Sequence, residues 1–100
     1  MTYHYYFVLA SQDFLVKEEP IEEVLRERKN HYKSIGKEID FWFVMNPDFI
    51  ENATFEDNYV DLPKQCAAII SSDKKFIQWL KLRIGFVLVG NFKSHSLINL

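Results

Sequence analysis

The chain has 100 residues, of which 48% are hydrophobic and 16% aromatic, and its formal net charge is −2. A chain of this size builds one core, and its apolar content excludes intrinsic disorder, so we expect a single domain over residues 1–100. The weakly acidic balance gives no general attraction to nucleic acid or to anionic membranes, and no apolar run approaches the roughly 20 residues of a membrane-spanning helix.

The first half of the chain predicts a strand, a helix and a second strand. Residues 3–10 are mostly aromatic or aliphatic and favour a strand. A helix is expected from about Pro20 to Ser34, because proline suits a first helical turn and Gly36 suits the position after the last turn. Residues 38–45 are again rich in aromatic and β-branched side chains and predict the second strand.

The second half of the chain begins with an irregular segment. Residues 46–64 are rich in turn-forming and acidic residues and predict a loop with one short helical turn. Residues 65–72 predict a third strand, which is followed by a helix from about Lys74 to Gly85 and a fourth strand over 86–92. We expect residues 93–100 to form a flexible tail.

The order of these elements is β-α-β, a loop, and β-α-β again. Right-handed crossovers make the two strands of each unit parallel and leave room for another strand between them. This order predicts the α+β class, as a four-stranded antiparallel sheet with two main helices on one face, a ferredoxin-like plait. A flavodoxin-like parallel sheet is the alternative, although it usually needs more strands and helices.

Both faces of the predicted sheet are apolar, although two helices can cover only one of them. In the first strand, for example, Phe7 points to one face while Tyr6 and Val8 point to the other. A small antiparallel sheet normally shows water a polar second face, and an apolar, aromatic surface usually meets another protein. Three occupants of the second face remain open: a different protein, a second copy of this chain, or the segment 46–64.

The sequence assembles no recognisable catalytic or metal centre. His4, His31 and His95 are scattered along the chain, and three glycines provide no phosphate-binding loop. Cys66 is the single cysteine and lies in an apolar run, which predicts a buried, reduced thiol. We therefore expect a protein without enzymatic activity, metal or cofactor, and a binding module is the favoured class.

Two arginines fall on the apolar stripes of the predicted helices. Arg83 lies beside Trp79, and a buried guanidinium without a partner is very costly. Arg83 is therefore either paired internally with a carboxylate such as Asp40 or exposed beside aromatic rings, a combination enriched at interface hot spots. Arg28 repeats the pattern on the first helix, where its aliphatic stem is expected to cover apolar surface while its head reaches water.

Four segments together carry a resemblance to a known family over roughly residues 3–92. They are Ala10–Leu15, Glu18–Arg28, Lys37–Trp42 and Phe76–Arg83. At this spacing the chain resembles the Low Chlorophyll Accumulation A family. These are small cyanobacterial and plastid accessory proteins of the oxidative Mg-protoporphyrin IX monomethyl ester cyclase. The chain departs from the family pattern at Gly85 and Asn91, where the family usually has acids.

The resemblance implies a noncatalytic protein that associates with the di-iron catalytic subunit of the cyclase. Its location would be the plastid stroma and thylakoid surface, or the cytoplasm of a cyanobacterium, with membrane contact only through the partner. A small tetrapyrrole-binding carrier and a homodimeric structural protein are the alternatives, and no nucleic acid partner is expected. The resemblance assigns partner binding to the segment around Asp40 and Phe41 and to Arg83, and we expect the neighbouring Trp42 and Trp79 to take part as well.

Overall fold

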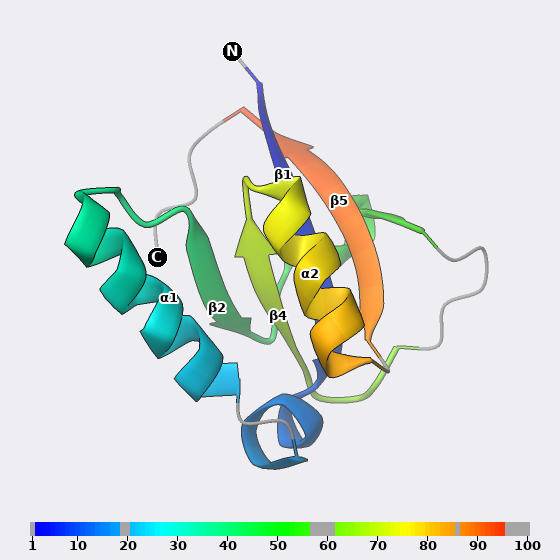
Figure 1. The fold of residues 1–100 in the computed structure, drawn as a ribbon. Coiled ribbons are helices and arrows are strands. Elements are labelled where there is room, and N and C mark those ends of the chain that lie inside the picture. Colours follow the sequence, from blue (N-terminus) through cyan, green and yellow to red (C-terminus); the bar gives the residue numbers. More distant parts are fainter. Residues whose placement is uncertain (1, 19–20, 57–61, 86, 96–100) are drawn as a thin grey trace.

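The computed structural model describes residues 2–18, 21–56, 62–85 and 87–95, and Figure 1 shows its fold. These residues form one antiparallel sheet of five strands and two main helices. The strands are β1 (Tyr3–Ser11), β2 (Phe41–Met45), β3 (Thr54–Phe55), β4 (Cys66–Ser71) and β5 (Leu88–Ser94). The helices are α1 (Ile21–Ile35) and α2 (Lys74–Ile84), with short pieces of π-helix at Phe14–Glu18 and of 3₁₀-helix at Phe49–Asn52.

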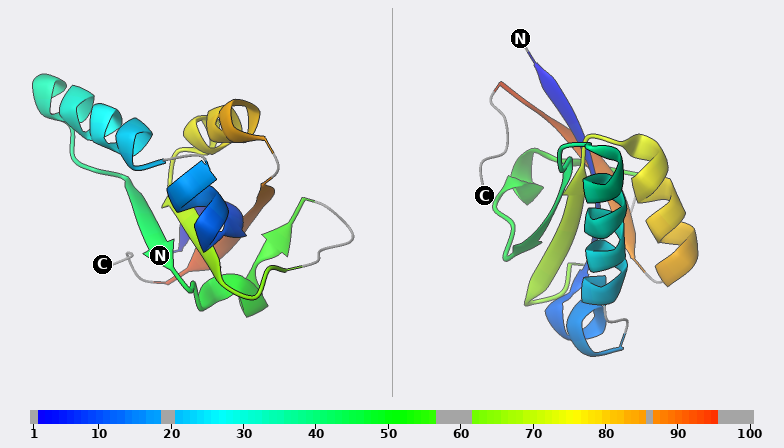
Figure 2. Two further views of the ribbon diagram at one scale, coloured as in Figure 1. Left: turned by 90° about the horizontal axis from the view of Figure 1, so that it is seen from below. Right: turned by 60° about the vertical axis from the view of Figure 1, so that its left-hand side comes forward.

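The sheet has the strand order β2-β4-β1-β5-β3, and every neighbouring pair is antiparallel. The four predicted strands keep their β-α-β, β-α-β order along the chain. Figure 2 shows both main helices on the same face of the sheet. The α+β class and the antiparallel arrangement are therefore confirmed, and the parallel alternative is excluded. Within the part of the chain that is described, no helix is long and apolar enough to cross a membrane.

The prediction of four strands is wrong by one, because the segment 46–64 contributes the short edge strand β3. β3 pairs with β5, and Phe55 lies opposite Gly90. A strand of two residues is too short to show the alternation from which strands are predicted. Gly90 permits the close approach, since a Cβ there would lie 2.6 Å from the Thr54 carbonyl oxygen and 2.6 Å from a ring carbon of Phe7.

The other predicted elements are present with shifted ends. β2 begins at Phe41, three residues later than the expected start at residue 38. β5 continues to Ser94, because β1 extends far enough to pair with it, so the start of the expected tail belongs to the sheet. The predicted start of the first helix, Pro20, and the rest of the tail, 96–100, lie outside the described residues.

A continuous apolar core fills the space between the helices and the sheet. The sheet contributes side chains of alternating positions that point toward the helices, as the period of two requires. The buried members of this core are Val8, Ala10, Leu15, Ile21, Leu25, Tyr32, Phe41, Ala67, Ile69, Phe76, Ile77, Leu80, Ile84 and Val89.

The chain itself covers the centre of the opposite face of the sheet. Phe49 stacks on Phe92 with ring centroids 4.4 Å apart and meets Phe7 edge-on at 4.9 Å. Phe55 also meets Phe7 edge-on, at 5.5 Å, and Phe7 has no exposed surface. In Figure 2 the green segment between β2 and β3 lies on the face away from the helices. Of the three possible occupants of this face, the segment 46–64 therefore fills the centre.

Candidate functional site

The two helices leave a groove between them on their side of the sheet. Its volume is about 590 Å³. Figure 2 shows the two helices standing apart on the same face of the sheet. Its lining consists of Val24, Glu27, Arg28 and His31 from α1, of Asp73 just before α2, and of Lys75, Phe76, Trp79 and Arg83 from α2.

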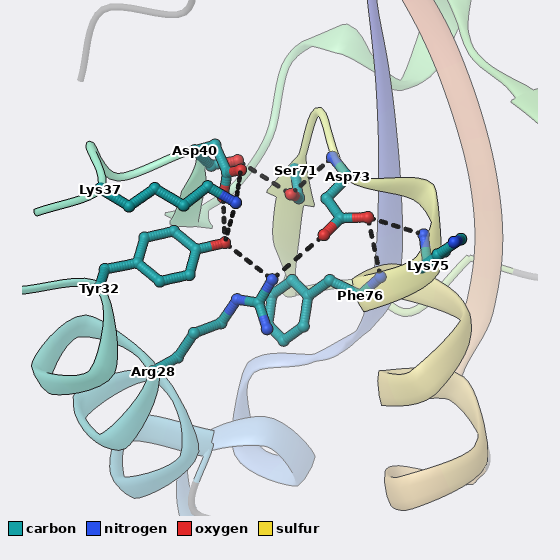
Figure 3. Close-up of polar contacts among 8 residues, drawn as sticks. All are labelled: Arg28, Tyr32, Lys37, Asp40, Ser71, Asp73, Lys75 and Phe76. Atoms are coloured by element: carbon teal, nitrogen blue, oxygen red, sulfur yellow. Dashed lines mark hydrogen bonds and ion pairs between the residues drawn. The ribbon is translucent and has the colours of Figure 1, made fainter. Parts of the chain in front are cut away.

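Arg28 extends from α1 toward Phe76 of α2 and lines this groove (Figure 3). Its guanidinium carbon lies 3.7 Å from the centroid of the Phe76 ring, a cation–π contact. Its Nη2 donates hydrogen bonds to the Tyr32 hydroxyl at 2.8 Å and to Asp73 Oδ2 at 3.3 Å. The expectation that the head of Arg28 reaches water is corrected, because stacking and two hydrogen bonds hold it and its side chain is only 24% exposed.

Asp73 has two roles at the start of α2. Its Oδ1 accepts from the backbone N–H groups of Lys75 at 3.0 Å and Phe76 at 3.4 Å, which makes it the N-cap of the helix. Its Oδ2 forms the ion pair with Arg28. The backbone N–H of Asp73 in turn donates to the Ser71 hydroxyl at 2.9 Å. The Asp73 carboxylate therefore caps the N-terminus of α2 and connects this helix to Arg28 of α1.

A second set of polar contacts connects Arg28 with Asp40. The Tyr32 hydroxyl accepts from Arg28 and donates to Asp40 Oδ1 at 2.8 Å. Lys37 Nζ lies 3.5 Å from Asp40 Oδ2 and donates to the Tyr32 hydroxyl at 3.4 Å. The carbonyl oxygen of Asp40 also accepts from the Ser71 hydroxyl at 2.9 Å. Asp40 is thus fixed through both its side chain and its backbone (Figure 3).

The pKa values in this network are shifted in consistent directions. Burial, and then the hydrogen bond to and the charge of Asp40, raise the pKa of the Tyr32 hydroxyl above its ordinary value. The hydrogen bond to Tyr32, and then the charge of Asp40, raise the pKa of the Lys37 amine. At neutral pH the hydroxyl therefore keeps its proton and can donate it to Asp40, while the amine stays charged.

Trp79 and Arg83 lie on the α2 wall of the groove. The Trp79 side chain is 49% exposed, and its ring stacks against that of Phe76, with centroids 6.2 Å apart and planes 19° from parallel. Arg83 is exposed and forms no hydrogen bond or ion pair with another described residue. Of its two possible settings, the internal pair with Asp40 is not formed, and the exposed Arg83 lines the same groove as Trp79.

The other three residues of the predicted site are placed differently. Asp40 lies beneath the groove and reaches it through Tyr32. Phe41 is 2% exposed and belongs to the core under the helices. Trp42 is half-buried on the opposite face of the sheet, where its ring meets Tyr5 edge-on at 6.1 Å. The fold therefore puts Trp79 and Arg83 in one groove, connects Asp40 to its lining through Tyr32 and Arg28 and Phe41 through Phe76, and places Trp42 on the other face of the sheet.

Sequence reasoning missed the central position of Arg28 and Asp73 in this site. The spacing of Arg28 and Tyr32 by four residues does put them on one helix face. Asp73 is recognisable as a helix cap, but its contact with Arg28 joins residues 45 positions apart in the chain. Among the described residues, no group of three or more His, Cys, Asp or Glu side chains could hold a metal ion.

Residues 3–94 match the family model described as Ycf54 protein. "Uncharacterized protein ycf54" of Porphyra purpurea is 53% identical over 90 residues, which cover 90% of this chain and 83% of the relative. The "Ycf54-like protein" of Synechocystis sp. is 47% identical over 92 residues, or 92% of this chain and 69% of the relative. "Protein YCF54, chloroplastic" of Arabidopsis thaliana is 32% identical over 94 residues, or 93% of this chain and 44% of the relative.

Solved structures show the same similarity in three dimensions. A crystal structure of a Nostoc sp. PCC 7120 protein has a TM-score of 0.84 and 48% identity, and the match covers 96% of this chain and 89% of the Nostoc chain. The Ycf54 protein of Synechocystis sp. PCC6803 has a TM-score of 0.83 and 42% identity, with 96% and 90% covered. This chain therefore belongs to the Ycf54 family, which has members in cyanobacteria, red algae and a plant chloroplast.

Proposed function

We propose that this chain is a noncatalytic accessory and assembly subunit of the aerobic Mg-protoporphyrin IX monomethyl ester cyclase in chlorophyll biosynthesis. In this proposal it binds the di-iron catalytic subunit and contributes no reacting group of its own. Membership of a family of cyanobacteria and plastids supports the proposal, as does the resemblance of four segments to the Low Chlorophyll Accumulation A family. The protein would act in the plastid stroma or the cyanobacterial cytoplasm and reach the thylakoid surface through its partner.

The observation that carries the proposal is the exposed Arg83, which pairs with no other described residue and lines one groove with the half-exposed Trp79. Arginine and tryptophan are among the residues enriched at the energetic centres of protein interfaces. The groove is also held in shape by contacts that exist without a partner, notably those of Arg28 with Asp73 and Phe76. A preformed surface loses less conformational entropy on binding, which favours association.

Asp40 and Phe41 would support partner binding from below rather than by direct contact. Asp40 is engaged by Tyr32 and Lys37, and Phe41 packs against the ring of Phe76 at 5.6 Å. Both therefore act on the groove through side chains that line or underlie it. This division separates two kinds of variant, those that remove a contact with the partner and those that loosen the groove.

The test is affinity isolation of the tagged protein from thylakoid membranes of a strain that lacks its own copy. We expect the wild-type protein to recover the di-iron cyclase subunit and Arg83→Ala to recover at least about tenfold less, given the typical cost of truncating a hot-spot arginine. Arg26→Ala is the matched control, because Arg26 is exposed on α1 and does not line the groove. Failure of the wild-type protein to recover the cyclase subunit would remove the proposal.

The tetrapyrrole carrier makes a different prediction from the binding subunit. A carrier should bind the porphyrin alone and shift its Soret band, whereas a binding subunit should leave the spectrum of added porphyrin unchanged. A titration of the purified protein into Mg-protoporphyrin IX monomethyl ester separates the two functions in one spectroscopic measurement.

A further inference from the structure

The charged side chains that line the groove do not balance one another. The ion pair with Arg28 already occupies Asp73. The other charged side chains of the lining are Glu27, which is negative, and Lys75 and Arg83, which are positive. Neither Lys75 nor Arg83 forms an ion pair with a described residue. The groove is therefore positive, although the whole chain has a net charge of −2. A local charge opposite to that of the whole protein favours an anionic ligand at this place.

Arg28 has hydrogen-bonding capacity left in the groove. A guanidinium carries five N–H donors, and both hydrogen bonds that Arg28 donates to Tyr32 and Asp73 leave from the single atom Nη2. Its Nε is buried without a partner, which is true of no other buried side-chain nitrogen or oxygen in the described residues. Because Nε itself is buried, a carboxylate in the groove would bond to the other N–H groups of the guanidinium, which lines the groove and is 24% exposed.

The groove also has apolar surface beside these hydrogen-bond donors. Val24 of α1 is half-buried and Trp79 of α2 is half-exposed, so both keep apolar surface open to a ligand. A groove with apolar walls between two helices suits an amphipathic helix, which buries its apolar side chains along the groove. The positive lining requires that acidic side chains flank this apolar stripe.

We propose that the groove between α1 and α2 receives an acidic amphipathic helix of the cyclase catalytic subunit. This inference rests on the proposed function and names the chemistry of the partner at the same site. The apolar side of the helix packs on Val24 and Trp79, and one of its carboxylates lies between Arg83 and Arg28. Lys75 lies at the edge of the groove and meets a second acid.

The first test measures the affinity of the immobilised protein for the detergent-solubilised cyclase subunit by biolayer interferometry. Arg83→Glu should weaken binding by at least about tenfold, because it puts a like charge against the acidic helix. Arg26→Glu makes the same charge change outside the groove and should stay within about twofold. Wild-type affinity should fall when sodium chloride is raised from about 50 to about 300 mM.

The second test locates the acidic segment with a carbodiimide, which joins an amine directly to a carboxylate in contact with it. Treatment of the complex should link Lys75 to an acidic helical peptide of the cyclase subunit, as identified by mass spectrometry. Lys75→Arg should abolish this link and leave the affinity within about threefold, because the charge is kept. Lys81, which lies outside the groove and pairs with Glu56, is the internal control.

The outcomes separate this inference from the proposed function. If the wild-type protein binds the cyclase subunit equally well with Arg83→Glu and at high salt, the acidic helix is excluded while the proposed function stands. If Lys75 forms no link in a complex whose other lysines do, the groove is not the docking site. If the free porphyrin ester binds with an affinity that depends on Arg83, the groove serves a tetrapyrrole carboxylate and the inference is overturned.

Discussion

Arg28 forms an ion pair with Asp73, the residue that caps α2, at 3.3 Å, and so connects the two helices across the groove. The same guanidinium stacks on Phe76 in the first turn of α2. Because Asp73 accepts the backbone N–H of Phe76, the arginine, the cap and the ring form one closed unit. The shape of the groove therefore depends on the start of α2 as much as on the side chains that line its walls.

The first prediction concerns Asp73, whose two oxygens have different tasks. Asp73→Ala removes the cap and the partner of Arg28 and should lower the free energy of unfolding by about 2–4 kcal/mol. Asp73→Asn keeps an oxygen for the cap and should cost only about 1–2 kcal/mol, the part due to the ion pair. Urea unfolding followed by far-ultraviolet circular dichroism measures both values.

Asp13→Ala is the control for the loss of a carboxylate, since Asp13 forms an exposed pair with Lys17 at 3.7 Å. It should change the free energy of unfolding by less than about 0.5 kcal/mol. Equal losses for Asp73→Asn and Asp73→Ala would contradict the assignment of the cap to one oxygen and the ion pair to the other.

The second prediction concerns Gly90, where β3 meets β5. A methyl group at this position would lie 2.6 Å from the Thr54 carbonyl oxygen, so Gly90→Ala should displace β3. We expect a loss of about 2–3 kcal/mol in the free energy of unfolding and faster amide exchange over residues 49–56. Gly36→Asn is the control, because asparagine tolerates the positive φ of 69° found there and open space surrounds it. Unchanged exchange over 49–56 would show that β3 does not need the glycine.

The fold was largely predictable because its long elements have regular apolar periods. Successive side chains of β1 point to alternate faces of the sheet, and both faces are largely buried. The apolar stripe of α2 stops before Gly85, the C-cap of the helix. β3 and the cover provided by Phe49 were not predictable, since they depend on pairing with residues far along the chain. The segment that closes the second face contains only a few aromatic anchors and no repeating pattern, so its placement is a property of the folded sheet.

Only the exposed residues of the candidate site, Trp79 and Arg83, could be predicted from the sequence. Helical spacing puts Trp79 and Arg83 on one stripe of α2, and the structure keeps them in one groove. The sequence gives no information on which acid meets which arginine, because Arg28 and Asp73 come from separate elements. A helical arginine in an apolar stripe can stack, pair or reach solvent, and its setting is decided by tertiary contacts such as the Phe76 ring.

The third prediction concerns alkaline pH. The pKa of Tyr32 is raised above 10.0 and that of Lys37 above 10.5, so the folded protein holds both protons more tightly than the unfolded chain. The stability from these shifts is complete below about pH 10 and is lost as the pH rises through the folded-state pKa values. We therefore expect the urea midpoint to fall above about pH 10.

Tyr32→Phe should remove most of this alkaline loss and lower stability at neutral pH, because Asp40 loses its donor. Tyr3→Phe is a suitable control, since it removes a hydroxyl from β1 outside the Arg28 network. Urea midpoints between pH 7 and pH 11 provide the measurement. An identical pH profile for the wild-type protein and Tyr32→Phe would exclude the hydroxyl as the titrating group.

The fourth prediction separates residues that contact the partner from residues that shape the groove. Phe41→Ala removes a ring with 2% exposure and should lower the free energy of unfolding by about 3–5 kcal/mol. Trp79→Ala removes a half-exposed ring and should cost about 1 kcal/mol or less in stability, while it lowers recovery of the cyclase subunit at least about tenfold. The two measurements are the urea midpoint and the partner recovered per folded molecule.

The outcome for Phe41→Ala decides how the groove works. If Phe41 acts only through packing, recovery of the cyclase subunit should fall in proportion to the folded fraction and return when the folded fraction is restored at lower temperature. Trp79→Ala should stay defective at every temperature, because its fold is intact and a contact is missing. Trp79→Phe restores an apolar ring of smaller area and should regain part of the binding, whereas full binding by Trp79→Ala would exclude the α2 wall as a partner surface.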